Sequence, residues 1–407
     1  LVLPDRTGMT PEVVAKLACL VREGATVIGP KPVTSVGLRG GEEAVGQVKK
    51  TADALWGSDE VPAGQKITYG KGAVYAGGNI RDILRAKGVS PDFTYESNKP
   101  EALIDYIHRR TEDMDIYYVV NRHERPEYIR ASFRVDSKMP ELWNPVTGEI
   151  TECPVYLSED GRVTAPLFLE PFGSVLVVFR KEMNTRYERI TRNGVCLFPE
   201  LPADTFAVSP FVKRSNGDLL LALPGEYVLT SSAGEINNIR IEGIPEIAID
   251  TPWEVSFDPK WGGPEKTVFT ELTLWNTSED PGIRYYSGTA VYTNTFEIPP
   301  GQHEGKRIYL DLGEMYNMAE VYVNGKPAGV WWQPPFTGDI TDFLENGPNQ
   351  LEIKVVNLWP NRLIGDNFLP ENERYTKTNV RKFTEDYPLR PSGLAGPVVL
   401  KMYEIQN

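Results

Sequence analysis

The strongest constraint on the fold is an alternation of apolar and polar residues that recurs three times between residues 306 and 356. Successive side chains of a β-strand point to opposite faces, so each run can bury one face and expose the other. After the second run, Asn324-Gly325 supplies the two residues with positive φ that a tight hairpin turn requires. We therefore predict an antiparallel β-sandwich over residues 251–407. The apolar positions that share a face in the three runs are Ile308, Leu310 and Leu312; Ala319, Val321 and Val323; and Leu351, Ile353 and Val355.

Residues 1–102 have a different pattern, which is typical of an α/β domain. Thr10-Pro11 indicates a helix start, a second helix is expected over Glu42–Trp56, and Asn79 is expected to cap a third. Strand–helix–strand units of this kind imply a parallel sheet, in a layout that resembles flavodoxin-like and amidotransferase-like domains. Only about three strands can be recognised, fewer than the five or so that are usual. The domain is therefore predicted to be partial, with its missing strands upstream of Leu1.

The middle of the chain returns to a period of two residues. Residues 103–182 predict a small antiparallel β-sandwich, with turn signals such as Glu159-Asp160-Gly161 between its strands. Residues 183–250 are strand-like but weakly patterned, and we assign them to a β-rich connector that could supply edge strands to the last domain. The predicted fold class is multidomain and mainly β: a partial α/β parallel-sheet domain, then an antiparallel β-sandwich, then a jelly-roll β-sandwich.

Composition argues against several classes of partner and site. The formal net charge of −13 disfavours nucleic acid, whose phosphates require a basic surface. No apolar run of about 18 residues occurs, so no membrane span is predicted. The cysteines and histidines show no metal-ligand spacing, and we predict no metal site. Cys19 is expected to be a buried, unreactive thiol. Ordinary surface or loop positions are expected for His108, His123 and His303.

Two motifs carry a resemblance to known families. Residues 285–290 read Tyr-Tyr-Ser-Gly-Thr-Ala, and residues 357–366 read Asn-Leu-Trp-Pro-Asn-Arg-Leu-Ile-Gly-Asp. The order of strands around them resembles the galactose-binding-like jelly roll of the glycoside hydrolase family 2 clan. This version of the motifs is similar to glycoside hydrolase family 106, the α-L-rhamnosidases. The resemblance extends more weakly over the rest of the chain and covers only what such enzymes carry after their catalytic barrel, which implies a non-catalytic C-terminal half.

The resemblance places the chemistry outside this chain. It implies that the family cleaves a rhamnosidic bond with two carboxylates, one acting as acid and one as base. It also locates both of them, together with a calcium-binding cluster, on the barrel. No segment here matches those motifs, and an α/β barrel needs about 250 residues, far more than the α/β segment offers. We therefore predict no catalytic residue and no cofactor in this chain, with calcium expected only in the absent catalytic domain.

Sugar binding is the chemistry that the sequence itself could support. Pyranose rings stack their C–H faces on aromatic side chains, while Asn, Asp and Arg pair with hydroxyl groups. Pro360 should end the strand after Trp359 and deliver the next polar residues into a loop, where binding groups tend to lie. The alternatives are a structural ion pair of Arg362 with Asp366, and packing of Trp331 and Trp332 inside the sandwich. The candidate substrate-binding residues are Tyr285, Tyr286, Trp359, Asn361, Arg362 and Asp366.

Three hypotheses for function follow. The first is part of an α-L-rhamnosidase-like hydrolase that supports a catalytic barrel upstream in the same polypeptide. Resemblance to family 2 relatives implies that the jelly roll then helps to line the active site of the barrel. The second is a free-standing carbohydrate-binding protein, and the third is a purely structural brace. The resemblance further implies a rhamnose-containing glycan or glycoside as partner, and a periplasmic or extracellular location.

Overall fold

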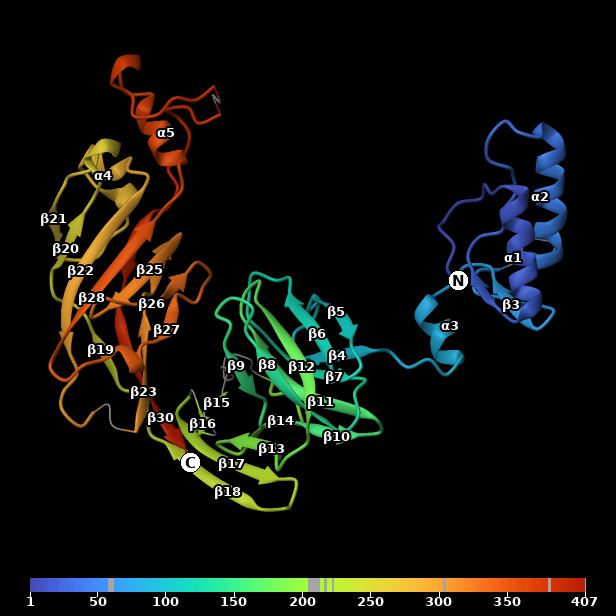
Figure 1. Ribbon diagram of the computed structural model, residues 1–407, viewed down its shortest axis with the longest axis horizontal. Helices are drawn as coiled ribbons and strands as arrows, with labels where there is room; N and C mark the ends of the chain where they lie inside the picture. Colours follow the sequence, from blue (N-terminus) through green and yellow to red (C-terminus); the bar gives the residue numbers. More distant parts are fainter. Residues whose placement is uncertain are drawn as a thin grey trace. The chain divides into compact units, whose positions relative to one another are not determined.

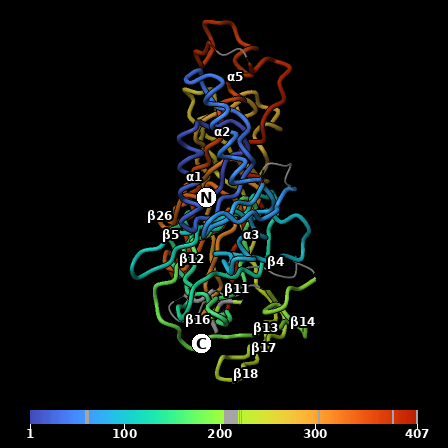
Figure 2. Tube along the Cα trace, turned by 90° about the vertical axis from the view of Figure 1, so that its right-hand side faces the viewer, coloured from blue at the N-terminus to red at the C-terminus, as the bar shows by residue number. Residues whose placement is uncertain are grey.

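The computed structural model describes residues 1–57, 62–203, 213–215, 218–221, 223–302, 305–379 and 382–406, so that His303 lies outside the described residues. The chain forms two compact units, Leu1–Pro91 and Asp92–Asn407. Figure 1 labels their elements, and Figure 2 follows the same chain from the side. The first unit ends before the boundary predicted at residue 102, because the next strand, Phe93–Ser97, pairs within the second unit. In the described part of the chain, every helix is too short or too polar to cross a membrane.

The first unit is a small α/β layer whose helices begin close to the predicted positions. Pro11 occupies the first turn of α1, and Gly24, with a positive φ, closes its C-terminus. The Asn79 side chain accepts the backbone N–H groups of Arg81 and Asp82 and so caps α3. The elements are α1 (Pro11–Glu23), β1 (Thr26–Ile28), α2 (Gly41–Trp56), β2 (Lys66–Tyr69), β3 (Gly72–Tyr75) and α3 (Ile80–Ala86).

The sheet of this unit has the strand order β1-β3-β2. β1 and β3 are parallel, as predicted, and Val2 extends the sheet through a parallel bridge to Ile28. β2 runs antiparallel to β3 because a tight turn joins them, so the sheet is mixed rather than wholly parallel. Apolar side chains of helices α1 and α2, such as Val14 and Val48, pack in one core with Val74 of the sheet. Cys19 is exposed because the buried stripe of α1 falls on another face, so the prediction of a buried thiol is wrong.

The second unit begins with an antiparallel β-sandwich. One sheet has the order β10-β11-β7-β4, and the other contains β9-β8-β12-β6-β5. The alternating side chains enclose a core that includes Tyr117, Phe133 and Phe179. The strands are β4 (Phe93–Ser97), β5 (Ile104–Arg110), β6 (Asp115–Asn121), β7 (Glu127–Phe133), β8 (Lys138–Trp143), β9 (Ile150–Glu152), β10 (Leu157–Glu159), β11 (Arg162–Leu169) and β12 (Ser174–Glu182).

Residues 183–250 contain a sheet of their own, with the order β14-β13-β17-β18. Its apolar residues, including Ile190 and Leu229, share a core with Tyr128 and Val155 of the sandwich. The short strands β16 and β19 pair instead with β30, the last strand of the chain. The strands are β13 (Tyr187–Arg192), β14 (Val195–Phe198), β15 (Lys213–Ser215), β16 (Asp218–Leu220), β17 (Gly225–Ser231), β18 (Ile236–Ile241) and β19 (Glu246–Ala248).

Residues 251–407 form the predicted jelly-roll sandwich. One sheet has the order β21-β20-β22-β28-β25-β26, and the opposite layer is built on β23, β27 and β30. Asn324 and Gly325 have φ values of 51° and 73°, as a tight hairpin requires. All nine apolar positions predicted to face inward are buried in one core. Short 3-10 turns occur at Pro259–Trp261, Trp275–Thr277, Thr341–Phe343 and Glu371–Glu373. The helices and strands are β20 (Trp253–Ser256), β21 (Thr267–Phe269), α4 (Pro281–Arg284), β22 (Thr289–Glu297), β23 (Lys306–Asp311), β24 (Glu314–Tyr316), β25 (Met318–Val323), β26 (Lys326–Trp331), β27 (Thr337–Asp339), β28 (Pro348–Val356), α5 (Pro360–Asp366), β29 (Gly393–Gly396) and β30 (Val399–Gln406).

A largely buried histidine links the two sheets of the first sandwich. His108 on β5 binds Asp92 through Nδ1 at 2.6 Å and Asp115 through Nε2 at 3.0 Å. Its ring stacks on Tyr117, with the centroids 4.0 Å apart. Arg134, which follows β7 in the other sheet, binds the same Asp92 carboxylate. The prediction of an ordinary surface residue is therefore wrong for His108, because its partners meet only in the folded sandwich.

The pair of Asp92 with His108 should make this sandwich sensitive to acid. Burial raises the pKa of Asp92, but hydrogen bonds and charge from His108 and Arg134 together outweigh it, so the pKa lies below its ordinary value. A carboxyl whose pKa is lower in the folded state adds stability above its unfolded pKa of about 3.9. That stability is lost as the pH falls through the folded value. We expect Asp92→Asn to lower the unfolding temperature at pH 7, with the difference from wild type shrinking below about pH 4.

Calorimetric unfolding from pH 7 to pH 3 measures this effect. Asp105→Asn is the matched control, because its carboxylate also pairs with an arginine but is 65% exposed. An exposed pair of this kind contributes little. A difference between wild type and Asp92→Asn that stays constant over the whole pH range would contradict the assignment.

Candidate functional site

One end of the jelly roll collects the residues predicted to bind sugar. β28 pairs with both β22 and β25, in a register that sets Val356 opposite Thr289 and Met318. The segments just before β22, just before β25 and just after β28 therefore meet at the same end of the sheet. The Asn357 side chain fastens two of them, because its amide donates to the carbonyl of Tyr286 at 2.8 Å.

The polar residues after Trp359 lie in a helix, which corrects the prediction of a loop. Pro360 stands in the first turn of α5, where a fixed φ and a missing N–H are compatible with a helix. β28 already ends at Val356, so the prediction that Pro360 ends the strand after Trp359 is wrong. The proline instead begins a helix of seven residues. Residues four apart face the same side of a helix, which brings Arg362 and Asp366 together.

Arg362 and Asp366 form a buried ion pair. Nε of Arg362 lies 3.0 Å from Oδ1 of Asp366, and each residue is 3% exposed. Asp366 also accepts the backbone N–H groups of Tyr375 at 3.3 Å and Thr376 at 2.8 Å. The Arg362 guanidinium lies over the Tyr375 ring, 4.7 Å from its centroid. The ion pair of the alternative interpretation is therefore present, and it fastens residues 375 and 376 to α5.

Asn361 and Tyr286 are also engaged inside the protein. Asn361 donates to the carbonyl of Arg390 and accepts its backbone N–H, both at 2.8 Å. The Tyr286 hydroxyl donates to the carbonyl of Thr289 at 2.8 Å and accepts the N–H of Asp258 at 3.1 Å. Burial raises the pKa of this hydroxyl. A role in sugar binding stays a prediction for the four candidates whose polar atoms are used within the fold: Tyr286, Asn361, Arg362 and Asp366.

Two of the candidates, Tyr285 and Trp359, present accessible aromatic rings. Trp359 is 49% exposed and meets Trp261 edge to face, with the ring centroids 5.0 Å apart. Tyr285 is partly buried, and its ring lies 5.6 Å from that of Phe368. Leu358, which precedes Trp359, and Phe368, which follows α5, are also exposed to solvent. We call the three aromatic residues Tyr285, Trp359 and Phe368 the aromatic surface, because their rings offer faces on which pyranose rings can stack.

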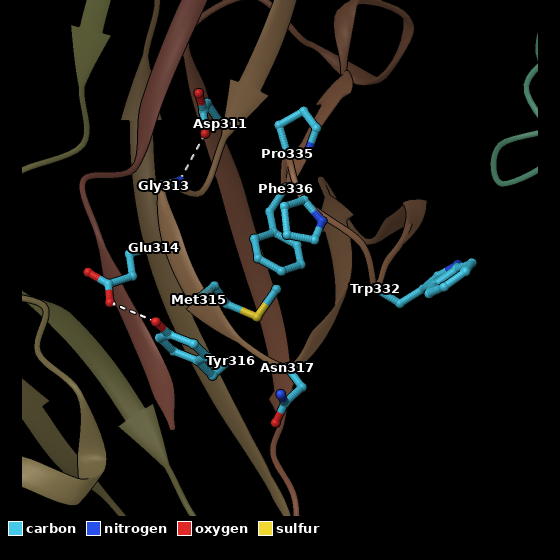
Figure 3. Close-up of a pocket in the computed structure, with 10 residues that line it drawn as sticks. Asp311, Gly313, Glu314, Met315, Tyr316, Asn317, Trp332, Pro335 and Phe336 are labelled. Carbon is cyan, nitrogen blue, oxygen red and sulfur yellow. Dashed lines mark hydrogen bonds between the residues drawn. The ribbon is translucent and has the colours of Figure 1, made fainter. Parts of the chain in front are cut away.

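A pocket lies where β25 begins and β26 ends. Its volume is about 480 Å³, and Figure 3 shows the two segments that line it, residues 311–317 and 332–336. Met315 and Phe336 meet at its centre and are buried. Trp332, 53% exposed, lies at the rim and points away from that centre. Of the two tryptophans considered in the sequence, Trp331 packs in the core, as the packing alternative predicts, whereas Trp332 does not.

Polar side chains border this pocket. Asp311 forms an ion pair of 2.7 Å with Lys401. Glu314 accepts the Tyr316 hydroxyl at 3.1 Å, and this hydrogen bond raises the pKa of Tyr316. No hydrogen bond from the described residues reaches the side-chain amide of Asn317. Sequence reasoning missed Glu314 and Asn317, because the hairpin of β25 and β26 separates them from the second lining segment and no local pattern marks them.

Comparison with known proteins relates two parts of the chain to glycoside hydrolase families. Residues 1–157 match the family model described as alpha-L-rhamnosidase, glycoside hydrolase family 106, and residues 240–381 match that of the family 2 sugar-binding domain. The predicted family resemblance is confirmed. A solved rhamnosidase from Novosphingobium sp. PP1Y is 32% identical, with a TM-score of 0.73, over 97% of this chain. A candidate beta-glucuronidase of Formosa agariphila is 23% identical over 99% of this chain.

The chain accounts for only part of these relatives. It covers 32% of the Novosphingobium rhamnosidase and 50% of the Formosa protein. A Ruminococcus gnavus beta-glucuronidase matches over 41% of this chain, with a TM-score of 0.30, too low to inform the fold. The comparisons therefore relate this chain to glycoside hydrolases through the regions that it shares with the rhamnosidase.

Removing the Asp366 carboxylate should destabilise the jelly roll far more than removing an exposed ring. Asp366→Ala leaves the Arg362 guanidinium buried without its partner, which costs about 3–5 kcal/mol. Trp359→Ala removes a half-exposed side chain, and we expect a loss of about 1 kcal/mol. Urea unfolding followed by circular dichroism compares the two. Equal losses would contradict a structural role for the ion pair.

Proposed function

We propose that this chain is the C-terminal, non-catalytic part of an α-L-rhamnosidase-like glycoside hydrolase. The observation that carries the proposal is the coverage: the solved rhamnosidase matches 97% of this chain, while this chain matches 32% of that rhamnosidase. In the proposed enzyme, a catalytic barrel of the same polypeptide lies upstream, and the parts described above support it. The substrate is a rhamnose-containing glycan or glycoside, and the enzyme acts in the periplasm or outside the cell.

The described residues support a non-catalytic role. The first unit has a sheet of order β1-β3-β2, whereas a catalytic α/β barrel closes a full ring of parallel strands. Hydrolysis of a glycosidic bond by this chemistry needs two carboxylates that face the sugar. Asp366 does not suit that task, because Arg362 and two backbone N–H groups hold its carboxylate inside the fold. The catalytic pair is proposed to belong to the barrel.

The calcium ion that the family resemblance implies is assigned to the barrel as well. Among the described residues, His, Cys, Asp and Glu side chains form no group of three or more that could hold a metal ion. Calcium prefers six to eight oxygen ligands, usually with several carboxylates. The described residues of this chain do not offer such a ligand set, and the proposed calcium site lies in the barrel.

The aromatic surface is proposed to help line the substrate site of the barrel. Trp359→Ala in the full-length enzyme should raise KM about fivefold with a small change in kcat, because ring stacking adds about 1 kcal/mol of binding. Val268→Ala is the matched control, since Val268 is also an exposed apolar residue of the jelly roll. Unchanged KM in Trp359→Ala would favour a purely structural brace instead.

A free-standing carbohydrate-binding protein is the alternative. The match of residues 240–381 to a sugar-binding domain and the pocket of about 480 Å³ favour it. It predicts that the 407-residue chain binds sugar and that no hydrolase accompanies it. Titration calorimetry with rhamnose and rhamnosylated oligosaccharides tests the first part, and absence of heat at millimolar sugar would count against it.

The decisive test of the proposed function has two parts: sequencing of the gene upstream of Leu1, and an assay of rhamnoside hydrolysis. The sequence upstream of the codon for Leu1 should encode several hundred further residues with barrel strands and paired carboxylates. The full-length protein should then hydrolyse an aryl α-L-rhamnoside, and the 407-residue chain should not. A start codon directly before Leu1, or equal activity of the two proteins, would refute the proposal.

A further inference from the structure

The outward face of the first sandwich carries a row of apolar side chains that crosses five strands. The strands β9, β8, β12, β6 and β5 lie side by side in one sheet (Figure 1). Their register sets one apolar residue of each strand directly opposite the next. We call these residues the apolar row; from one edge to the other they are Ile107, Tyr118, Leu176, Trp143 and Ile150.

The core of the sandwich lies on the other side of these strands. Tyr117 belongs to that core, and successive side chains of a strand point to opposite faces, so Tyr118 points outward. Residues directly opposite in register share a face, so the other four point outward as well. Both ends of the row are open, since Ile107 is 53% exposed and Ile150 is 50% exposed. None of the five belongs to a hydrophobic core formed by the described part of the chain.

Two of these strands are apolar on both faces. Residues 116–120 of β6 and residues 175–179 of β12 are uninterrupted runs of aliphatic and aromatic side chains. β28 of the jelly roll shows the contrast, because Glu352 and Lys354 alternate with its buried residues. A sheet with one face in water alternates in that way, whereas continuous apolar runs are typical of strands that are covered on both faces. The composition of β6 and β12 therefore indicates that a partner covers the outward face.

Charged residues that flank the row are paired with one another. Near one edge, Asp105 binds Arg122 at 3.2 Å. Towards the other edge, the Glu141 carboxylate binds Arg180 at 2.6 Å and Lys181 at 2.9 Å. These pairs leave little net charge for a charged partner. An apolar centre within a polar rim is the usual anatomy of a protein–protein interface, so the face fits another apolar protein surface.

The size of the row favours a partner in the same polypeptide over a second copy of the chain. Neighbouring strands lie about 4.8 Å apart, so the row is roughly 19 Å long. Together with the adjoining residues Ile116 and Val178, the apolar area is on the order of 300 Å². A stable interface between separate proteins buries about 800 Å² on each partner. A tethered partner needs less area, because linkage gives it an effective concentration of about a millimolar. The net charge of −13 further opposes self-association.

We propose that the apolar row is the docking surface for the segment of the same polypeptide that precedes Leu1. Four of its five strands, β5, β6, β8 and β9, lie within residues 1–157, the part that matches the rhamnosidase family model. This chain covers 32% of the Novosphingobium rhamnosidase and 50% of the Formosa protein, so both relatives have a large part outside it. The inference rests on the proposed function for the identity of that segment as the catalytic barrel.

The rate of thiol labelling measures whether the row is covered. Cys19→Ser first removes an exposed native thiol, and Ile107→Cys or Ile150→Cys then places a thiol at one end of the row. A maleimide should modify both positions quickly in the 407-residue chain. In the full-length enzyme, labelling should be at least about tenfold slower, because a covered thiol reacts only when the contact opens. Mass spectrometry of the labelled peptides assigns each rate to its position.

Val268→Cys is the matched control. Val268 is 56% exposed, also lies on a strand, and belongs to the jelly roll rather than to the first sandwich. Its labelling rate should be the same in the 407-residue chain and in the full-length enzyme. Thermal unfolding verifies that each variant is folded, and the two ends of the row provide independent variants.

Equal labelling rates of Ile107→Cys and Ile150→Cys in the two proteins would overturn the proposal. Slow labelling in both proteins would overturn it as well, because the row would then be covered within the 407-residue chain or by a second copy, which size-exclusion chromatography distinguishes. An active full-length rhamnosidase with equal rates would retain the proposed function and lose the docking surface. A full-length protein that protects the row but hydrolyses no rhamnoside would retain the docking surface and lose the enzyme.

Discussion

The register of β28 between β22 and β25 is the constraint on which the candidate site of the jelly roll depends. A slip of one residue in such a ladder would turn every apolar side chain to the other face. Ile353 and Val355 are fully buried, so the hydrophobic effect holds the strand in place. That register brings Thr289 and Met318 opposite Val356, and three segments far apart in the sequence then meet at one end of the sheet.

Buried and exposed groups at this end have different tasks. The ion pair of Arg362 with Asp366 uses its hydrogen bonds to hold α5 against its neighbouring segments. Buried polar groups are retained when they are fully satisfied, since an unpaired one is costly. Trp359 and Trp332 take no part in this hydrogen-bond network, and about half of the surface of each residue is exposed to solvent. Binding functions are therefore better sought in the exposed aromatics and in the pocket than in the charged motif that is most visible in the sequence.

The remainder of the second unit is held together by ion pairs and a shared apolar core. Asp92, its first residue, is bound to His108 and Arg134, so the chain enters the first sandwich at a fixed point. The sheet of β13, β14, β17 and β18 then covers part of that sandwich through a shared core. These contacts fix the first sandwich and the sheet that follows it relative to each other.

Local patterns determined much of the architecture. The alternating runs identified the core faces of the jelly roll, Asn324-Gly325 identified a hairpin, and Asn79 identified a helix cap, because each depends on residues that are close together in the chain. The motifs around Tyr285 and Trp359 were likewise sufficient to indicate the family. For the candidate site, the residues named from the sequence come together at one end of the jelly roll, and their role in sugar binding stays a prediction.

Which of those residues can contact a ligand depends on interactions that form only in the folded protein. Asn361 is hydrogen-bonded to Arg390, which lies 29 residues away in the sequence, and Asp311 to Lys401, which lies 90 residues away. Such distant partners determine whether a polar side chain is already hydrogen-bonded within the protein. The pocket and the partners of His108 depend on similar long-range contacts. Patterns of neighbouring residues were therefore enough to predict the buried faces of the strands and the similarity to rhamnosidases. The fold decided burial, charge pairing and the shape of the site, because those are properties of side chains that meet only after the strands have paired.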